Sequence, residues 1–147
     1  MKIYIATDHR GVEIEDQIVK YLMENNFEVI RSNIPHNETD DYVDFAVDIS
    51  NKVSKDNNAF GILICGTGIG MSIAANKIKG IRAAKCSSTE DAFLCRNDNN
   101  ANVLCLSYKT DLQELFDIIN VFISTPFSTE ERHHRRVSKI IELENGE

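Results

Sequence analysis

Short apolar runs alternate with amphipathic segments along the whole chain, and this alternation restricts the fold more than any other feature. The runs are typical of strands, and the segments between them carry apolar residues at helical spacing. We expect strands over 2–7, 27–31, 60–65, 81–86 and 103–106, and helices over 11–26, 44–55, 71–78, 88–96, 111–123 and about 129–144. Strands that alternate with helices form a parallel sheet covered on both faces. The sequence therefore predicts one α/β domain over residues 1–147, a three-layer αβα sandwich with a five-stranded parallel sheet.

The run 60–65 is the most continuous apolar segment and is expected to be a central, buried strand. In such sheets, ligands bind at the carboxyl ends of the strands, where the strand order reverses. With the strand order 2-1-3-4-5, that point lies between the first and third strands. The residues that leave these two strands, 8–10 and 65–67, are then expected to meet.

Composition excludes several classes of protein. The 147 residues are 42% hydrophobic, enough for a core that needs no disulfide or metal. Sixteen basic and 23 acidic residues give a net charge of −7, which argues against a general nucleic-acid binder. No apolar stretch resembles a signal peptide or approaches the roughly 20 residues of a membrane span. Four cysteines without a C-x-x-C pair indicate reduced thiols, so we expect a cytoplasmic protein.

A glycine-rich segment follows the buried strand: Gly66, Thr67, Gly68, Ile69 and Gly70. Its backbone N–H groups can converge on a phosphate or an enediolate. It is not a Walker loop, since no Gly-Lys-Ser/Thr follows, and Met71 stands where G-x-G-x-x-G needs glycine, so a nicotinamide cofactor is disfavoured. The alternative is a plain strand-to-helix turn.

Three reactive side chains leave the same two strands. Cys65 directly precedes the glycine segment, where a thiol can become a general base or nucleophile, or can remain inert packing. Asp8 can orient a hydroxyl and His9 can bind phosphate or transfer protons, but Asp8 can also cap the next helix. Both interpretations stay open from the residues alone. His36 has no partner that the sequence identifies.

The densest basic run in this acidic chain covers 132–136. Arg132 and Arg136 share one helical face, and two guanidinium groups suit a phosphate monoester, although a solvated face or a subunit contact is the alternative. The polar stretch 96–102 is expected between a helix and the last strand, as a turn or as a source of hydrogen bonds to a polyol.

Several motifs together resemble one family over nearly the whole length. They are Asp8-His9-x-Gly11, the run GILICGTGIGMSIAANKIKGIRAA over 61–84, Asn102-Val103-Leu104, and Arg132-His133-x-x-Arg136-Val137. In these the chain resembles the type B ribose-5-phosphate isomerases and the related galactose-6-phosphate isomerase subunits.

The resemblance implies a Rossmann-like fold, a homodimer or tetramer with active sites between subunits, and no metal or cofactor. Cys65 matches the base that moves a proton between C1 and C2. The amides of the segment from Gly66 to Gly70 match the loop that holds the enediolate. Substrate contacts are implied for Asp8, His9, Tyr42 and Asn99, and phosphate contacts for Arg132 and Arg136 of the partner chain.

Three positions depart from the family. Asp98 stands where a ring-opening histidine is usual, and a carboxyl group has a reference pKa of about 3.9 against about 6.5 for imidazole. Lys109 replaces a phosphate-binding arginine, and Glu131 replaces a glycine. One subunit type of galactose-6-phosphate isomerase also lacks that histidine, and its partner subunit supplies it.

We therefore expect a cofactor-free aldose–ketose isomerase that interconverts ribose 5-phosphate and ribulose 5-phosphate, with Cys65 and Asp98 as catalytic residues. The alternatives are an isomerase of galactose 6-phosphate or allose 6-phosphate, as one subunit of a mixed complex, or a catalytically silent protein that binds a sugar phosphate. We expect no nucleic-acid or membrane partner.

Overall fold

The computed structural model describes residues 1–146; Glu147, the last residue of the expected domain, lies outside them. Five parallel strands form one sheet across these residues. The strands are β1 (Lys2–Thr7), β2 (Glu28–Arg31), β3 (Ala59–Cys65), β4 (Ala83–Lys85) and β5 (Val103–Ser107). A short 3-10 turn, η1 (His9–Gly11), precedes the helices α1 (Val12–Glu24), α2 (Tyr42–Ser54), α3 (Ile69–Ala75), α4 (Thr89–Asn99), α5 (Leu112–Ser124) and α6 (Glu131–Leu143).

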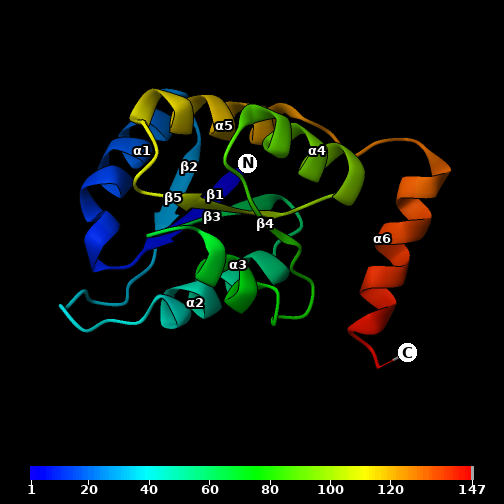
Figure 1. The fold of residues 1–147 in the computed structure, drawn as a ribbon, viewed down its shortest axis with the longest axis horizontal. Helices are drawn as coiled ribbons and strands as arrows, with labels where there is room; N and C mark the ends of the chain where they lie inside the picture. Colours follow the sequence, from blue (N-terminus) through cyan, green and yellow to red (C-terminus); the bar gives the residue numbers. More distant parts are fainter. Residues whose placement is uncertain (147) are drawn as a thin grey trace.

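The sheet is the middle of three layers, which confirms the predicted sandwich. Figure 1 shows α1, α4 and α5 over one face and α2 and α3 over the other. All seven residues of β3 are buried, because both of its faces are covered. Ile62 and Ile64 pack with the first group of helices, and Leu63 and Cys65 pack with the second. Alternation along β3 therefore assigns Cys65 to the face of α2 and α3.

The strand order is β2-β1-β3-β5-β4, so the expected order 2-1-3-4-5 is wrong in its last two strands. The chain passes from β3 through α3 to the edge strand β4, then returns through α4 on the opposite face to β5. Right-handed crossovers demand this change of face when the direction along the sheet reverses. The exchange leaves β1 beside β3, so the expected meeting point of these two strands is confirmed.

Burial explains which strand takes the edge. The residues of β5 are almost all buried, whereas β4 is short and its three residues are partly exposed. The expected strand 81–86 is accordingly reduced to Ala83–Lys85, and α3 begins at Ile69, inside the glycine segment. Only part of the polar stretch 96–102 is a loop, because its first four residues form the last turn of α4. Asn100 ends that helix with a φ of 51°.

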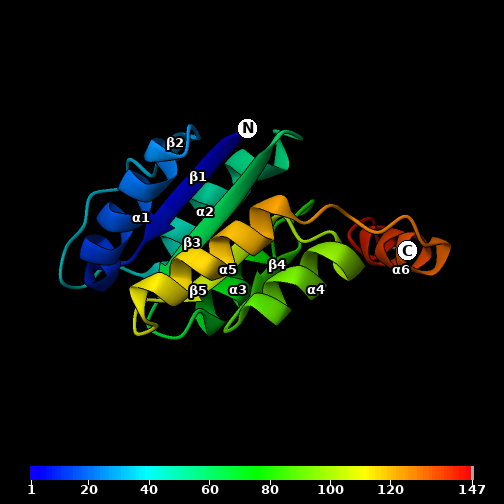
Figure 2. The ribbon, with the colours of Figure 1, turned by 90° about the horizontal axis from the view of Figure 1, so that it is seen from above.

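The last helix, α6, stands beside the rest of the molecule rather than over the sheet (Figures 1 and 2). Only one of its faces packs on the chain, through the buried residues His133 and Val137. Ile140, Ile141 and Leu143 leave apolar surface exposed. Among the described residues, no helix has the length and apolar character needed to cross a membrane.

The buried carboxyl group of Glu15 on α1 makes stability depend on pH. Burial raises the pKa of Glu15 from 4.5 to about 7, against the opposing pull of the Arg31 guanidinium 3.4 Å away. A raised pKa means that folding favours the protonated form, so this contribution is full below pH 4.5 and is lost as the pH rises through 7.

We therefore predict that Glu15→Gln stabilises the protein at pH 8.5, by about 2 kcal/mol, and changes its stability little at pH 4.5. Thermal or urea unfolding of both proteins at the two pH values measures this difference. A variant less stable than the wild type at pH 8.5 would show that the ion pair with Arg31 outweighs the burial of the charge.

Candidate active site

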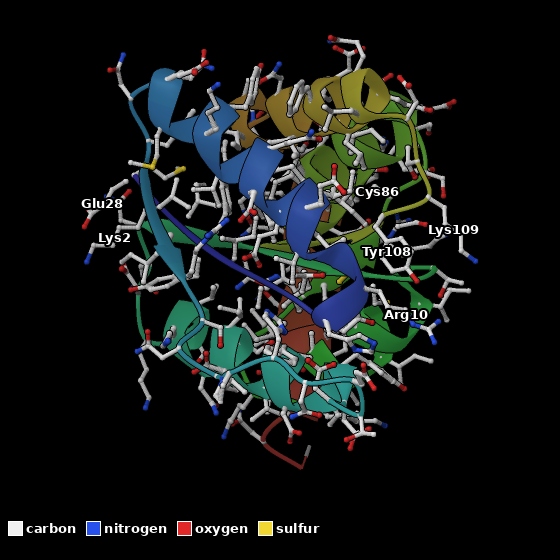
Figure 3. The ribbon with its side chains drawn as sticks, turned by 90° about the vertical axis from the view of Figure 1, so that its left-hand side faces the viewer. Lys2, Arg10, Glu28, Cys86, Tyr108 and Lys109 are labelled. Atoms are coloured by element: carbon white, nitrogen blue, oxygen red, sulfur yellow. The ribbon has the colours of Figure 1, made fainter. Side chains whose placement is uncertain are left out.

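The parallel pairing of β1 and β3 brings the first site residues together. Thr7 lies opposite Ile64, so Asp8 and Cys65 leave their strands at the same level of the sheet. On the other side of β3, Cys65 lies opposite Ser107 of β5, so Lys109 follows at this same carboxyl edge. Figure 3 shows Arg10, Tyr108 and Lys109 together on one side of the molecule. Lys2 and Glu28, the first residues of β1 and β2, lie on the opposite side.

The thiol of Cys65 accepts a hydrogen bond from the glycine segment. The backbone N–H of Gly68 lies 3.2 Å from Sγ of Cys65, and the N–H of Ile69 donates to Oγ1 of Thr67 at 3.1 Å. Gly68 has a φ of 78°, a conformation that residues with a side chain rarely adopt. Ser107 ties the loop to β5 by donating from its hydroxyl to the carbonyl of Gly66 at 2.7 Å. The loop and the sulfur are therefore held together at the carboxyl end of β3.

The other cysteines are buried in the core, in keeping with the expected reduced thiols. Cys86 and Cys95 lie with their Sγ atoms 3.8 Å apart. This hydrogen bond, and then burial, raises the pKa of Cys86, and burial raises the pKa of Cys105. The thiols of Cys86 and Cys105 therefore stay protonated at neutral pH. Their surroundings differ from those of Cys65.

The ring of Tyr42, the first residue of α2, lies against the glycine segment. A Cβ atom added to Gly70 would lie 2.6 Å from Cζ of Tyr42, closer than real Cβ contacts allow. Glycine is therefore needed here for the close approach of the ring. Tyr42 remains 39% exposed, so its aromatic face adjoins the same carboxyl edge and is accessible from solvent.

Two histidines share one carboxylate beside this edge, an arrangement that the sequence did not reveal. Oδ1 of Asp40 lies 2.7 Å from Nδ1 of His9 and 3.1 Å from its backbone nitrogen, and Oδ2 lies 3.0 Å from Nδ1 of His36. Burial alone would raise the pKa of Asp40, but the hydrogen bonds from His36, His9 and the backbone outweigh it and lower the pKa to about 2. Asp40 is thus a carboxylate throughout the physiological range.

The side chain of Asp8 has a local partner. Its Oδ1 accepts the backbone N–H of Arg10 at 3.1 Å, which is the capping arrangement considered as an alternative. The cap uses one lone pair of one oxygen, and a carboxylate has acceptor sites to spare. Capping and contact with a ligand are therefore compatible at Asp8.

The remaining predicted residues lie at the other end of the strands, where β5 begins. Asp98 and Asn99 end α4 just before β5 begins, whereas Cys65 and Lys109 lie beyond the carboxyl end of β3 and β5. The five residues of β5 span about 13 Å between these two edges. Arg132 and Arg136 are on α6, which packs against α4. One copy of the chain therefore presents two separate groups of predicted site residues.

A buried histidine joins α6 to Asp98. Nε2 of His133 lies 3.7 Å from Oδ1 of Asp98, and the residue is only 6% exposed. Its Nδ1 has no hydrogen-bond partner among the described residues. Arg132 is exposed and pairs with Glu130 at 2.7 Å. His133 is not among the site residues expected from the sequence, and the motif Arg132-His133 is the sequence signal that marks it.

Comparison with known proteins shows which family this chain resembles. Residues 3–140 match the family described as Ribose/Galactose Isomerase. The chain belongs to this family. The expected family membership is thereby confirmed over almost the whole length.

Among the described residues, no three His, Cys, Asp or Glu side chains form a group that could hold a metal ion.

Individual isomerases of this family are similar over nearly their full lengths. A probable ribose-5-phosphate isomerase B of Mycoplasma genitalium is 42% identical over 146 residues, 97% of this chain and 95% of that protein. The type B ribose 5-phosphate isomerase of Trypanosoma cruzi has a TM-score of 0.93 at 39% identity, with 100% of both chains covered. The Mycoplasma genitalium enzyme crystallised with ribulose-5-phosphate has a TM-score of 0.93 at 40% identity, covering 99% of this chain and 97% of that one.

The close approach of Tyr42 predicts different effects for two glycines of the loop. Gly70→Ala would displace the Tyr42 ring and lower the free energy of unfolding by roughly 1–3 kcal/mol. At Gly66 the nearest atom to an added Cβ, the hydroxyl oxygen of Tyr108, is 3.5 Å away, an ordinary contact. We expect Gly66→Ala to change stability by less than about 0.5 kcal/mol. Urea unfolding compares the two, and equal effects would contradict the packing described.

Proposed function

We propose that this chain is an aldose–ketose isomerase that interconverts ribose 5-phosphate and ribulose 5-phosphate without a metal or cofactor. The observation that carries the proposal is the position of Cys65. Its Sγ ends the central strand and accepts the N–H of Gly68, beside a loop whose other amides can face a substrate oxygen. The similar Mycoplasma genitalium enzyme, crystallised with ribulose-5-phosphate, supports this choice of sugar.

The proposed reaction moves two protons within the open-chain sugar, one from C2 to C1 and one from O2 to O1. The Cys65 thiolate removes the proton from C2, the electron pair of that bond forms a C1–C2 double bond, and negative charge moves onto O1. Backbone amides of the loop stabilise this cis-enediolate. A proton passes from O2 to O1, and the Cys65 thiol then returns its proton to C1. The aldehyde has become a hydroxyl and C2 a ketone, with no net gain or loss of atoms.

The neighbouring groups would hold the sugar in place for this transfer. Asp8 and His9 leave β1 beside Cys65, and we propose that they contact the sugar and its phosphate. Tyr42 would cover the sugar from the side of α2, and Lys109 would contribute a positive charge at the end of β5. A lysine at this position supplies charge without the two-pronged geometry of arginine.

Completion of the site would require a second copy. Asp98, Asn99, Arg132 and Arg136 lie at the far edge of their own sheet, so they cannot meet the Cys65 of the same chain. We propose that the chain acts as one domain over 1–147 in a homodimer, with α6 reaching across to the partner. The exposed apolar side chains of Ile140, Ile141 and Leu143 suit such a contact. We place the enzyme in the cytoplasm.

Opening of the furanose ring is assigned to Asp98, with His133 beside it. A carboxyl group needs a proton before it can act as an acid, and an imidazole holds one more readily near neutral pH. The 3.7 Å separation of His133 from Asp98 would let the pair share this task. This arrangement would replace the single histidine that is usual in the family.

The test is turnover of ribose 5-phosphate by the purified chain alone. We predict activity in the wild type and a loss of roughly a hundredfold or more in Cys65→Ala, since a general base commonly contributes that much. Binding of the sugar phosphate, measured by calorimetry, should persist in Cys65→Ala. The control is Cys86→Ala, which removes a buried thiol from the core and should keep its turnover.

Other results would assign a different role. Turnover of galactose 6-phosphate or allose 6-phosphate, without turnover of ribose 5-phosphate, would change the substrate. Binding of the sugar phosphates with no turnover would point to a silent homologue or to a missing partner subunit. Retained activity in Cys65→Ala would contradict Cys65 as the base.

A further inference from the structure

The Asp40 carboxylate joins two segments that are far apart in the sequence. His9 lies on η1 at the end of β1, whereas His36 and Asp40 belong to the loop between β2 and α2. Both oxygens of Asp40 are used: one faces the ring and backbone of His9, and the other faces the ring of His36 and the N–H of Asn37, the latter at 3.4 Å. The loop is thereby fastened to the candidate active site.

Packing restricts the cluster further. The side chain of Asp40 is only 5% exposed, while those of His9 and His36 are 28% and 32% exposed. The ring of His36 stacks on Phe45 of α2 with 4.9 Å between ring centroids. His36 is therefore held from two sides, and it holds Asp40 in turn. Asp8, Arg10 and Asp41 carry charges next to members of the cluster in the sequence, and Glu15 on α1 lies within electrostatic reach of His36.

The chemistry of the carboxylate decides which nitrogen of each ring carries a proton. An ionised carboxylate accepts hydrogen bonds and donates none, so the ring nitrogen facing it must bear hydrogen. For His9 this nitrogen is Nδ1, at 2.7 Å. Nε2 is then the nitrogen left for another partner, and the hydrogen bond at Nδ1 fixes both the tautomer and the plane of the ring.

We propose that Asp40 is a positioning residue for His9: it holds the imidazole with Nδ1 protonated and presents Nε2 to the phosphorylated sugar. His36 supports this role by anchoring the second oxygen of Asp40. The proposal rests on the proposed function for the identity of the ligand. The state of the His9 ring does not depend on that function and can be measured without substrate.

The first experiment measures the tautomer of His9 by long-range proton–nitrogen NMR on 15N-labelled protein. His9→Gln identifies the signals of His9 by their disappearance. We expect neutral His9 to carry its proton on Nδ1 in the wild type, and to shift largely to Nε2 in Asp40→Ala. The control is Asp41→Ala, which removes the neighbouring exposed carboxylate, whose side chain does not cap α2. A wild-type His9 with its proton on Nε2 would overturn the proposal.

The second experiment measures KM and kcat with ribose 5-phosphate. We expect Asp40→Ala to raise KM about tenfold, as loss of a charged hydrogen bond does, while kcat changes by less than about threefold. Asp40→Asn keeps an oxygen for Nδ1 of His9 and should recover most of the affinity; it also serves if Asp40→Ala does not fold. Asp41→Ala should match the wild type.

The outcomes separate this proposal from the proposed function. Absence of turnover in the wild type would contradict the proposed function, and the tautomer of His9 would still test the placement by Asp40. With turnover present, an unchanged KM in Asp40→Ala would overturn the positioning role. An equal rise of KM in Asp41→Ala would also overturn it, because the effect would then reflect net charge in the loop.

Discussion

The parallel pairing of β1 with β3 is the contact on which the candidate site depends. It places Thr7 opposite Ile64, so that Asp8, His9 and Cys65 leave the sheet together. The pairing is held by burial, since β3 is covered by helices on both faces and every one of its residues is buried. Hydrogen bonds of a parallel ladder, shielded from water on both sides, keep the two strand ends in register. The reactive groups are therefore positioned by the sheet itself.

The loops at the carboxyl ends of β1 and β3 position the side chains of the candidate site further. Gly68 turns the chain after Cys65 and directs its N–H at the sulfur. Gly70 leaves room for the Tyr42 ring. Asp40 fastens the loop before α2 to His9. The contacts made by Gly70 and by Asp40 join segments that lie apart in the sequence, and all three contacts lie at the carboxyl ends of the strands.

Periodicity sufficed to predict the elements, the sandwich and the meeting of β1 with β3, because these follow from apolar spacing and from strand-end rules. It failed for the order of β4 and β5, which depends on the face taken by α4. The Asp40 cluster was also missed, since the loop 33–41 has no periodic pattern and His9 is 31 positions away from Asp40. The family resemblance implied that Arg132 acts from the partner chain. The fold places Arg132 and Asp98 at the opposite end of the strands from Cys65, a separation that the motifs alone do not give.

This separation makes the central proposal testable, namely that each active site is built from two copies of the chain. Cys65→Ala and Arg132→Ala would each be inactive or strongly impaired alone, since each lacks one half of every site. Subunits of the two variants, mixed by unfolding and refolding together, would form mixed dimers with one intact site and recover about a quarter of wild-type activity. Recovery to that level is the result we predict. A mixture no more active than its components would contradict the shared site.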